Sequence, residues 1–152
     1  MIFDELAEIY FEIDYDYSVK EADARARHYK RIEASYRRKR ELNDQAYFLF
    51  MFTRLEDRIK KLSIELIEKK YNTLTNWKYR RTWEILYERR EKNIYFLDRV
   101  ALLTEMGQAD YELIKKYYRQ RNNIGHGGNS FTITIDISTV VADMQRLYYD
   151  LK

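Results

Sequence analysis

A short segment near residue 125 gathers the residue types that could do chemistry. Three of the four glycines of the chain lie there, around one of its two histidines: Gly125, Gly127 and Gly128. That histidine is His126, and Arg121 and Asn122 precede it by five and four positions. Histidine can take or give a proton near neutral pH. Arginine stays charged and can grip two phosphate oxygens at once. The segment is therefore suited to acid–base chemistry on a phosphate ester.

The helical period gives these residues definite directions. Arg121 follows Ile114 by seven positions and Tyr117 by four, which places it on the inner face of its helix. A buried arginine is costly unless it is paired or faces a polar cavity. Asn122 and His126 share one face if the helix continues between them, whereas Arg121 and His126 point about 140° apart. Only the long arginine side chain, or a loosened last turn, lets both groups reach one ligand.

The same residue types are also typical of an ordinary helix C-terminus. Cations suit the negative end of the helix dipole, and Gly or Asn readily adopts the left-handed conformation of a C-terminal cap. Spacing alone therefore leaves a catalytic and a purely structural interpretation of this segment open.

The segment from Arg121 to Gly127 resembles the Arg-x4-6-His motif of HEPN domains. These are helical bundles, and many are RNases of toxin–antitoxin, phage-defence and CRISPR systems. The commonest form of the motif has Asn directly after Arg and often Gly after His, as Asn122 and Gly127 are placed here. The apolar segment 47–56, with its Leu-Glu step, is similar to the early helix of that family. The resemblance covers residues 44 to 152, approximately.

This resemblance implies an all-α, antiparallel helical bundle and a metal-independent endoribonuclease without a cofactor. Arg121 and His126 would be catalytic, and Asn122 would orient the histidine or contact the phosphate. Glu56 would hold Arg121, or would only pair with a neighbouring base on its own helix. HEPN RNases are thought to join two Arg–His pairs in a homodimer with a composite active site. RNA, with tRNA as one candidate, would be the substrate of a toxin or antiviral effector restrained by an antitoxin or sensor partner.

One departure and two alternatives qualify this hypothesis. A HEPN subgroup controlled by a nucleotidyltransferase antitoxin extends the motif to Arg-x4-His-x-Tyr, and Gly128 stands at the tyrosine position here, which argues against that control mechanism. The first alternative is a non-catalytic HEPN-like module that binds RNA, a nucleotide or a partner protein. Its RNA binding would survive His126→Ala and depend mainly on salt. The second is a purely structural subunit.

Other catalytic classes find little support in the sequence. There is no cysteine, the two histidines lie far apart, and no cluster of acids with metal-ligand spacing occurs beyond the acidic N-terminal segment. No metal site is therefore predicted. Neither a glycine-rich phosphate loop nor a Gly-x-Ser-x-Gly motif is present.

Composition predicts the fold class. The chain has 152 residues, no proline and only 4 glycines, and a fold without these helix breakers is helical. This length fits a single domain, which we divide into an N-terminal helical extension, 1–43, and a core bundle, 44–152. No apolar run approaches the roughly 20 residues of a membrane span, and the acidic start is unlike a secretory signal. We expect a soluble, cytoplasmic protein without membrane contact.

The expected elements follow from apolar periodicity and capping signals. A short acidic helix, 2–12, is followed by a joint at 14–18 and by a long charged helix to about residue 42. Asn43-Asp44 would start the core helix, which reaches residue 70 and whose first turns should be buried on every side. Its inner stripe is Phe48, Phe52, Leu55, Ile59, Leu62 and Leu66. After a loop at 71–77, further helices are expected at 80–90, 94–106, 110 to about 125, and 138–151. Residues 131–135 are interpreted as an extended loop, and Ser138 as the cap of the last helix.

The charges form two opposed blocks. Residues 1–19 hold six acids and no base, whereas residues 20–41 hold nine bases and four acids. The basic block either pairs with the acidic one or offers a face to a polyanion, with the acidic segment as a shield or docking element. His28, within the basic block, is expected at the surface. The candidate contacts to an RNA backbone lie in two basic stretches, 25–40 and 78–92: Arg37, Arg38, Arg40, Arg80 and Arg81.

Overall fold

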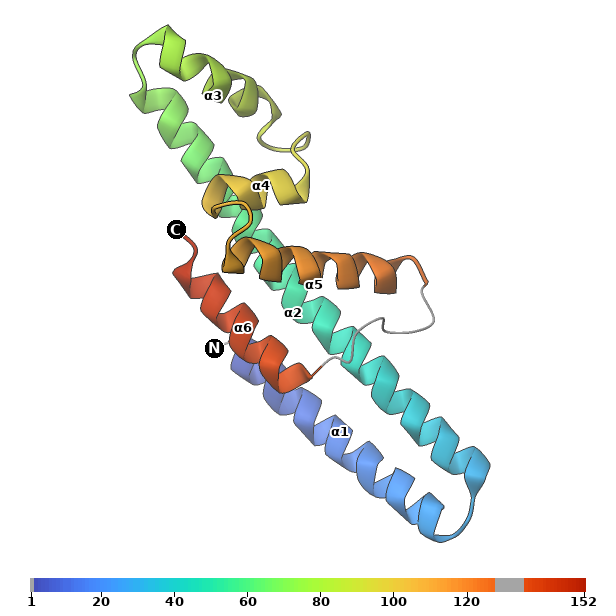
Figure 1. Cartoon of the computed structure of the whole chain (residues 1–152). Coiled ribbons are helices and arrows are strands. Elements are labelled where there is room, and N and C mark those ends of the chain that lie inside the picture. Colours follow the sequence, from blue (N-terminus) through green and yellow to red (C-terminus); the bar gives the residue numbers. More distant parts are fainter. Residues whose placement is uncertain (1, 128–135) are drawn as a thin grey trace. The chain divides into compact units, whose positions relative to one another are not determined.

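Every regular element that the structure describes is a helix. The computed structural model describes residues 2–127 and 136–152. Its helices are α1 (Ile2–Ala26), α2 (Lys30–Thr73), α3 (Trp77–Arg89), α4 (Phe96–Leu103), α5 (Ala109–Gly125) and α6 (Ile137–Asp150) (Figure 1). The predicted all-α class is confirmed for these residues. The extended loop predicted at 131–135 lies outside them. None of the described helices has the length and apolar character that a membrane span requires.

The chain forms two compact units. Unit 1 comprises Met1–Phe52 and Gln120–Gln145, and unit 2 comprises Thr53–Arg119 and Arg146–Lys152. Helices α2, α5 and α6 each contribute residues to both units. The boundary between the units therefore falls within helices, and residue 43, where the sequence predicted the end of an extension, lies inside unit 1.

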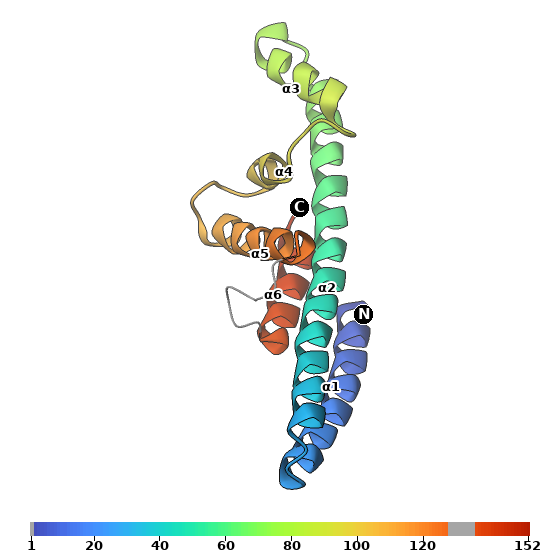
Figure 2. The same cartoon turned by 90° about the vertical axis from the view of Figure 1, so that its right-hand side faces the viewer.

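Within unit 1, α1 and the first half of α2 form an antiparallel hairpin (Figures 1 and 2). The Tyr10 hydroxyl donates a hydrogen bond of 2.6 Å to Asp44 Oδ1 across this hairpin. Nearer the turn, the rings of Tyr17 and Tyr36 lie 6.1 Å apart between centroids. The first pair joins an early position of α1 to a later position of the hairpin arm of α2, and the second joins a later position of α1 to an earlier one of α2, as expected for an antiparallel pair.

The hairpin corrects three boundaries predicted from the sequence. Neither the joint at 14–18 nor the helix start at 43–44 interrupts a helix. Ser18 Oγ bonds back to the Tyr15 carbonyl oxygen (2.7 Å) instead of capping a new helix. Asp44 is held by Tyr10, so its carboxylate does not act as an N-terminal cap. The actual break divides the predicted long charged helix at residues 27–29.

This break carries no glycine or proline signal. His28 adopts a φ of 60° there, in the left-handed region that non-glycine residues visit at a cost of about 1 kcal/mol. The histidine is exposed, so the prediction that it lies at the surface is confirmed. Contacts between the two helices, and not the local sequence, therefore place the turn.

The core of unit 1 joins the hairpin to the early part of α6. Its buried side chains include Phe3, Tyr10, Tyr47, Phe48, Met51, Phe52, Val140 and Met144. The amide of Gln145 on α6 donates to Asp4 Oδ1 over 3.4 Å. Phe50, however, is 58% exposed, so the prediction that the first turns of the core helix are buried on every side is wrong. At its N-terminus α6 is capped by Asp136, which accepts from the Ser138 backbone N–H (3.2 Å), and not by Ser138 itself.

Unit 2 is built on the second half of α2. Three members of the predicted stripe, Leu55, Ile59 and Leu62, are buried, but Leu66 is only half-buried and Ile67 takes the inner position. Their buried partners come from α4, α5 and the chain end: Val100, Tyr111, Ile114, Tyr117, Leu147 and Leu151.

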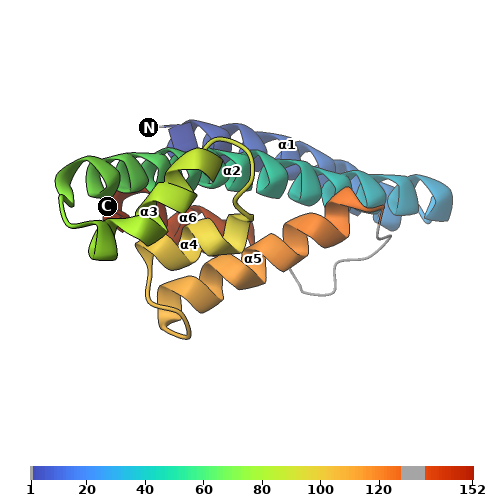
Figure 3. The same cartoon turned by 90° about the horizontal axis from the view of Figure 1, so that it is seen from above.

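The helix α3 folds back along the end of α2 (Figure 3). The rings of Tyr71 and Tyr87 stack at 4.2 Å, and Arg90 Nε donates to Glu68 Oε1 over 2.9 Å. Asn76 caps α3 by accepting from the Lys78 backbone N–H (2.9 Å). No residue of α3 is buried, so this helix is attached to α2 chiefly by ring stacking and ion pairing.

Candidate functional site

The candidate site lies at the C-terminal end of α5, within unit 1. The His126 N–H donates to the Asn122 carbonyl oxygen over 3.0 Å, so helical hydrogen bonding continues through Gly125 as predicted. The next N–H, that of Gly127, donates to the Ile124 carbonyl oxygen (3.2 Å). Gly127 has a φ of +75°, the left-handed conformation in which a side chain is strained. A glycine cap thus ends the helix directly after the histidine.

The structure brings Arg121 and Asn122 into contact. Arg121 Nη1 donates to Asn122 Oδ1 over 3.1 Å, and both side chains are half-buried. His126 is exposed, one helical turn beyond Asn122 on the same face. The site therefore combines a guanidinium oriented by a neighbouring amide with an imidazole that solvent and a substrate can reach. Arg121 is less buried than the helical period predicts, because it lies only one turn from the helix end.

The structure assigns Glu56 to unit 2, whereas Arg121, Asn122 and His126 belong to unit 1. Glu56 is half-buried on α2 and lines a cavity of that unit.

Three of the five arginines predicted to contact RNA are engaged in ion pairs of the hairpin. Arg37 pairs with Glu33 at 3.0 Å, and Arg38 pairs with Glu41 at 3.0 Å. Arg40 donates two hydrogen bonds to Asp14, of 2.8 and 3.1 Å. Of these three, only the pair of Arg40 with Asp14 joins the basic block to the acidic one, as in the first of the two alternatives left open by the charge pattern, whereas Glu33 and Glu41 belong to the basic block itself. A phosphate would have to compete with these carboxylates.

The centre of this network is the buried carboxylate of Glu21. It accepts from Arg25 (3.0 Å), Arg40 (3.2 Å) and Arg37 (3.4 Å), while its side chain is only 7% exposed. Burial raises the pKa of Glu21, but the hydrogen bonds from Arg40 and Arg37 outweigh it and hold that pKa below its ordinary value. The carboxylate is therefore ionised and fully compensated at neutral pH.

Arg80 and Arg81, on α3 in unit 2, have different surroundings. The guanidinium of Arg80 lies 5.8 Å from the Tyr71 ring centroid, and that of Arg81 lies 5.7 Å from the Trp77 ring. Arg81 and Trp77 are both exposed. An exposed arginine beside an exposed indole can contact both the phosphate and the base of a single strand.

Sequence reasoning missed a buried arginine in unit 2. Arg99 on α4 is only 5% exposed. It donates to Ser63 Oγ (2.9 Å) and to the Arg90 carbonyl oxygen (2.6 Å), and neither acceptor is a carboxylate. Burial lowers the pKa of Arg99 from its ordinary value, although the charge of Glu91 opposes this. No sequence signal marks this residue, since α4 is too short for an apolar period to distinguish inner from outer positions.

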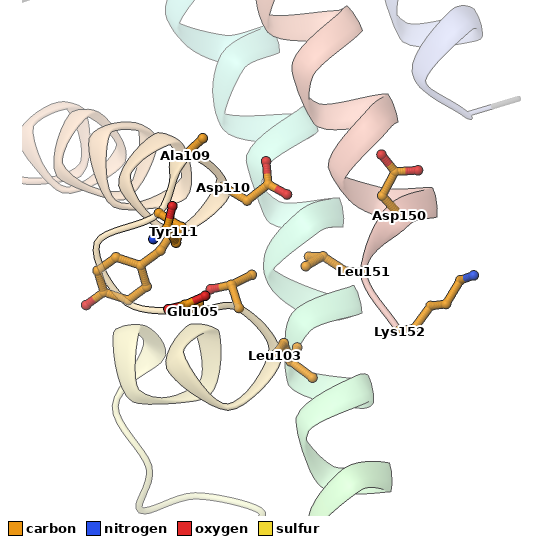
Figure 4. Close-up of a pocket in the computed structure, with 10 residues that line it drawn as sticks. Leu103, Glu105, Ala109, Asp110, Tyr111, Asp150, Leu151 and Lys152 are labelled. Atoms are coloured by element: carbon orange, nitrogen blue, oxygen red, sulfur yellow. The ribbon is translucent and has the colours of Figure 1, made fainter.

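Unit 2 contains two cavities whose walls carry charged side chains. The larger, about 490 Å³, lies between the start of α5 and the end of α6 (Figure 4). Two carboxylates that line it, those of Asp110 and Asp150, are bridged by Arg146 at 2.9 and 3.8 Å. The second, about 280 Å³, is lined by Arg99. Among the described residues, no group of three or more acids and histidines is arranged to hold a metal ion.

Comparisons with protein-family models, with curated proteins and with solved structures found no match to this chain.

Proposed function

We propose that the end of α5 is the catalytic centre of a metal-independent endoribonuclease of the HEPN type. The observation that carries this proposal is the arrangement of three side chains on one helix end. Arg121 donates to Asn122 over 3.1 Å, and His126 is exposed one turn further on. This set supplies an oriented cation for a phosphate and a titratable group for proton transfer. The assignment to HEPN rests on the Arg-x4-His resemblance.

The reaction is attack of a ribose 2′-hydroxyl on the adjacent phosphorus. The 2′-oxygen forms a bond to phosphorus while the bond from phosphorus to the 5′-oxygen breaks, which leaves a 2′,3′-cyclic phosphate and a 5′-hydroxyl. His126 takes the proton of the 2′-hydroxyl or delivers one to the leaving oxygen. Arg121 binds the non-bridging oxygens, whose charge grows in the transition state. Its hydrogen bond with Asn122 supports an orienting role for the amide on the arginine, a role distinct from the predicted one on the histidine.

One protomer supplies one such histidine, although the reaction needs both a base and an acid. A homodimer that brings His126 and the partner's His126 to one phosphate would supply both groups and a pair of arginines. The exposure of His126 is compatible with such a shared site. Arg81, with Trp77 beside it, is the more suitable of the predicted RNA contacts, because its charge is not committed to a hairpin ion pair. The role as toxin or antiviral effector, with an antitoxin or sensor as partner, rests on the resemblance.

The test is RNA cleavage by the purified protein in EDTA, with tRNA and a mixed-sequence single strand as substrates. We expect products with cyclic phosphate and 5′-hydroxyl ends. His126→Ala and Arg121→Ala should each lower the rate by about 100-fold or more. Two matched variants should retain it. Arg119→Ala removes an exposed arginine two positions away on α5, and His28→Asn replaces the other histidine with a residue that tolerates its left-handed backbone.

Three outcomes would overturn the proposal. Cleavage that requires a divalent cation would reject the metal-independent reaction. Equal cleavage by the wild type and both active-site variants would move the chemistry elsewhere or to a contaminant. Absence of cleavage, with salt-dependent RNA binding that survives His126→Ala, would replace the enzyme by the non-catalytic binding module.

A further inference from the structure

The outer face of α1 carries a continuous row of apolar side chains. Its members follow one another at steps of four, four, three and four positions: Phe11, Tyr15, Val19, Ala22 and Ala26. This spacing is close to the helical period, so the five side chains lie in one stripe along the helix. All five are exposed, and the three larger ones are 47%, 72% and 48% exposed. A contiguous apolar stripe of this kind is typical of a surface that another helix covers.

This apolar stripe is distinct from the face of α1 that packs within unit 1. That inner face carries the buried residues of the helix: Phe3, Ala7, Tyr10, Glu21 and Ala24. At 100° per residue the two faces are centred roughly 130° apart around the helix axis. Helix α1 therefore has one apolar face that its own unit buries and a second one that remains exposed.

Exposed charges of opposite sign lie near the two ends of the stripe. Glu5 and Glu8 lie in the first turns of α1, and Lys30 and Arg31 lie where the hairpin turn enters α2. All four side chains are exposed, and within the described part of the chain none of them forms an ion pair. The acidic and basic ends are roughly 30 Å apart along α1. Because of this distance, these groups cannot pair with each other within one chain.

The basic end also offers apolar surface. A cavity of about 540 Å³ lies there, lined by His28, Tyr29, Lys30, Arg31 and Ile32. Two of these side chains, those of Tyr29 and Ile32, are 54% and 47% exposed. The end of the hairpin is therefore suited to an element that presents both apolar side chains and carboxylates. The first turns of α1 have this composition, since Ile2 and Ile9 are exposed on the same side as Glu5.

We propose that α1 pairs with the α1 of a second copy of this chain, in antiparallel orientation. The two-fold axis lies between Tyr15 and Val19, and the two apolar stripes cover each other. The acidic first turns of each copy then lie beside the basic hairpin end of the other, so both end contacts form at once. A parallel pair would place acids against acids. Flanking charges set helix orientation in coiled coils in the same way, and two-fold symmetry closes the assembly at two copies.

This interface is independent of the ribonuclease chemistry. It specifies a surface for self-association, and it contains neither Arg121 nor His126. All its residues lie on α1 and on the hairpin turn, within unit 1. The pairing is therefore tested by the oligomeric state alone, and its failure would leave the proposed cleavage reaction untouched.

Analytical ultracentrifugation of the full chain measures the pairing. We expect a monomer–dimer equilibrium with a Kd in the micromolar range. The Kd should rise by about tenfold between roughly 50 and 500 mM salt, because the contacts at the two ends are exposed ion pairs.

A charge in the middle of the stripe should break the dimer. Tyr15→Glu places two carboxylates close to the two-fold axis and should raise the Kd by about 100-fold or more. Tyr15 is 72% exposed, so the variant should fold normally, which far-UV circular dichroism checks. Val19→Glu is a second variant of the stripe with the same expected result. Tyr79→Glu is the matched control, because Tyr79 is 65% exposed but lies on α3, and it should leave the Kd unchanged.

Exchange of the end charges tests the orientation. One double variant, Glu5→Lys with Glu8→Lys, reverses the acidic end, and another, Lys30→Glu with Arg31→Glu, reverses the basic end. Each variant alone should dimerise about tenfold more weakly or worse, because like charges then meet at both ends. An equimolar mixture of the two should restore a heterodimer with nearly the affinity of the wild type, since every end again meets its opposite charge.

Four results would contradict the proposal. A wild type that stays monomeric at roughly 100 µM would reject self-association, even if α1 bound a helix of another protein. A dimer that survives Tyr15→Glu and Val19→Glu would be held by another surface. Failure of the mixture to restore the dimer would reject the antiparallel orientation. Growth beyond two copies with rising concentration would reject the two-fold closure.

Discussion

Two arginines, one in each unit, show opposite ways of placing a guanidinium in a helical protein. Arg40 in unit 1 donates to both oxygens of Asp14 and to Glu21, and its hydrogen bonds, that to Asp14 above all, raise its pKa above the ordinary value. Arg99 in unit 2 is more deeply buried but donates only to a hydroxyl and a carbonyl, and its pKa is lowered by burial. The fold therefore gives Arg40 two carboxylate partners, whereas neither hydrogen-bond acceptor of Arg99 is a carboxylate.

This difference separates charges that the fold pairs with carboxylates from buried charges that it pairs with neutral groups. A charge that is hydrogen-bonded to carboxylates should stabilise the fold, and loss of either partner should be costly. A buried charge that is hydrogen-bonded only to neutral groups should contribute little to stability. The following measurements test this distinction.

The largest effect is expected for Glu21→Ala. This change removes the buried carboxylate on which Arg25, Arg37 and Arg40 converge, and should lower the free energy of unfolding by about 3 kcal/mol. Urea denaturation measures it. Glu41→Ala is the control, because its pair with Arg38 is about half exposed and should contribute less than about 0.5 kcal/mol. Equal losses in the two variants would mean that burial does not distinguish these ion pairs.

Replacing each arginine by methionine tests the comparison directly. Arg40→Met leaves Asp14 and Glu21 with fewer partners, so we expect a loss of about 2 kcal/mol. Arg99→Met removes both the desolvation penalty of a buried charge and two hydrogen bonds. The gain and the loss should nearly cancel, so the free energy of unfolding should change by less than about 1 kcal/mol. The readout is again urea denaturation. A greater loss for Arg99→Met than for Arg40→Met would reverse the comparison.

The ion pairs around Glu21 should also make the free energy of unfolding depend on pH. The folded-state pKa of Glu21 lies below its ordinary value, so its contribution is complete above the unfolded pKa of about 4.3 and is lost as the pH falls through the folded value. The Glu21→Gln variant should be less stable at pH 7 and show a flatter decline below pH 4. Unfolding curves across pH 2–7 would measure this. Parallel declines in the two proteins would assign the acid sensitivity to other carboxylates.

The smallest effect is expected for Asp44, whose pKa is shifted in the opposite direction to that of Glu21. Burial raises the pKa of Asp44, so the folded state disfavours its ionised form at neutral pH. As the pH falls through that raised value toward the unfolded pKa, this carboxyl makes the fold more stable. Asp44→Asn keeps an oxygen that can accept from Tyr10 and should be equally stable or more stable at pH 7, by less than about 1 kcal/mol. A clear loss would show that the ionised form is the one the hairpin needs.

Local signals in the sequence predicted those features that depend on neighbouring residues. The end of α5 belongs to this group, because Gly127 at the left-handed cap and the four-residue spacing of Asn122 and His126 are both local. The same holds for the stripe through Leu55 and Ile59, which the helical period alone identifies.

Features that depend on distant residues were not predictable in this way. Asn43-Asp44 has the composition of a helix start, yet the helix continues because Tyr10, 34 positions away, bonds the carboxyl group of Asp44. His28 forms a turn without a glycine, since α1 and α2 pack against each other on either side of it. Arg99 donates a hydrogen bond to Ser63, 36 positions earlier, and no local property of α4 predicts that contact.

Unit 1 is formed by two separate stretches of the chain, and this affects the order in which its parts fold. The hairpin contacts join residues at most a few tens of positions apart, such as the 26 that separate Asp14 from Arg40. The contact between Asp4 and Gln145 spans 141 positions. Loop closure over short distances costs less entropy, so the hairpin can form early. The segment 120–145 can join the hairpin at a low cost in entropy only after residues 53–119 have become compact and so have shortened the loop between them. The end of α5, with Arg121 and His126, is therefore one of the last parts of unit 1 to assemble.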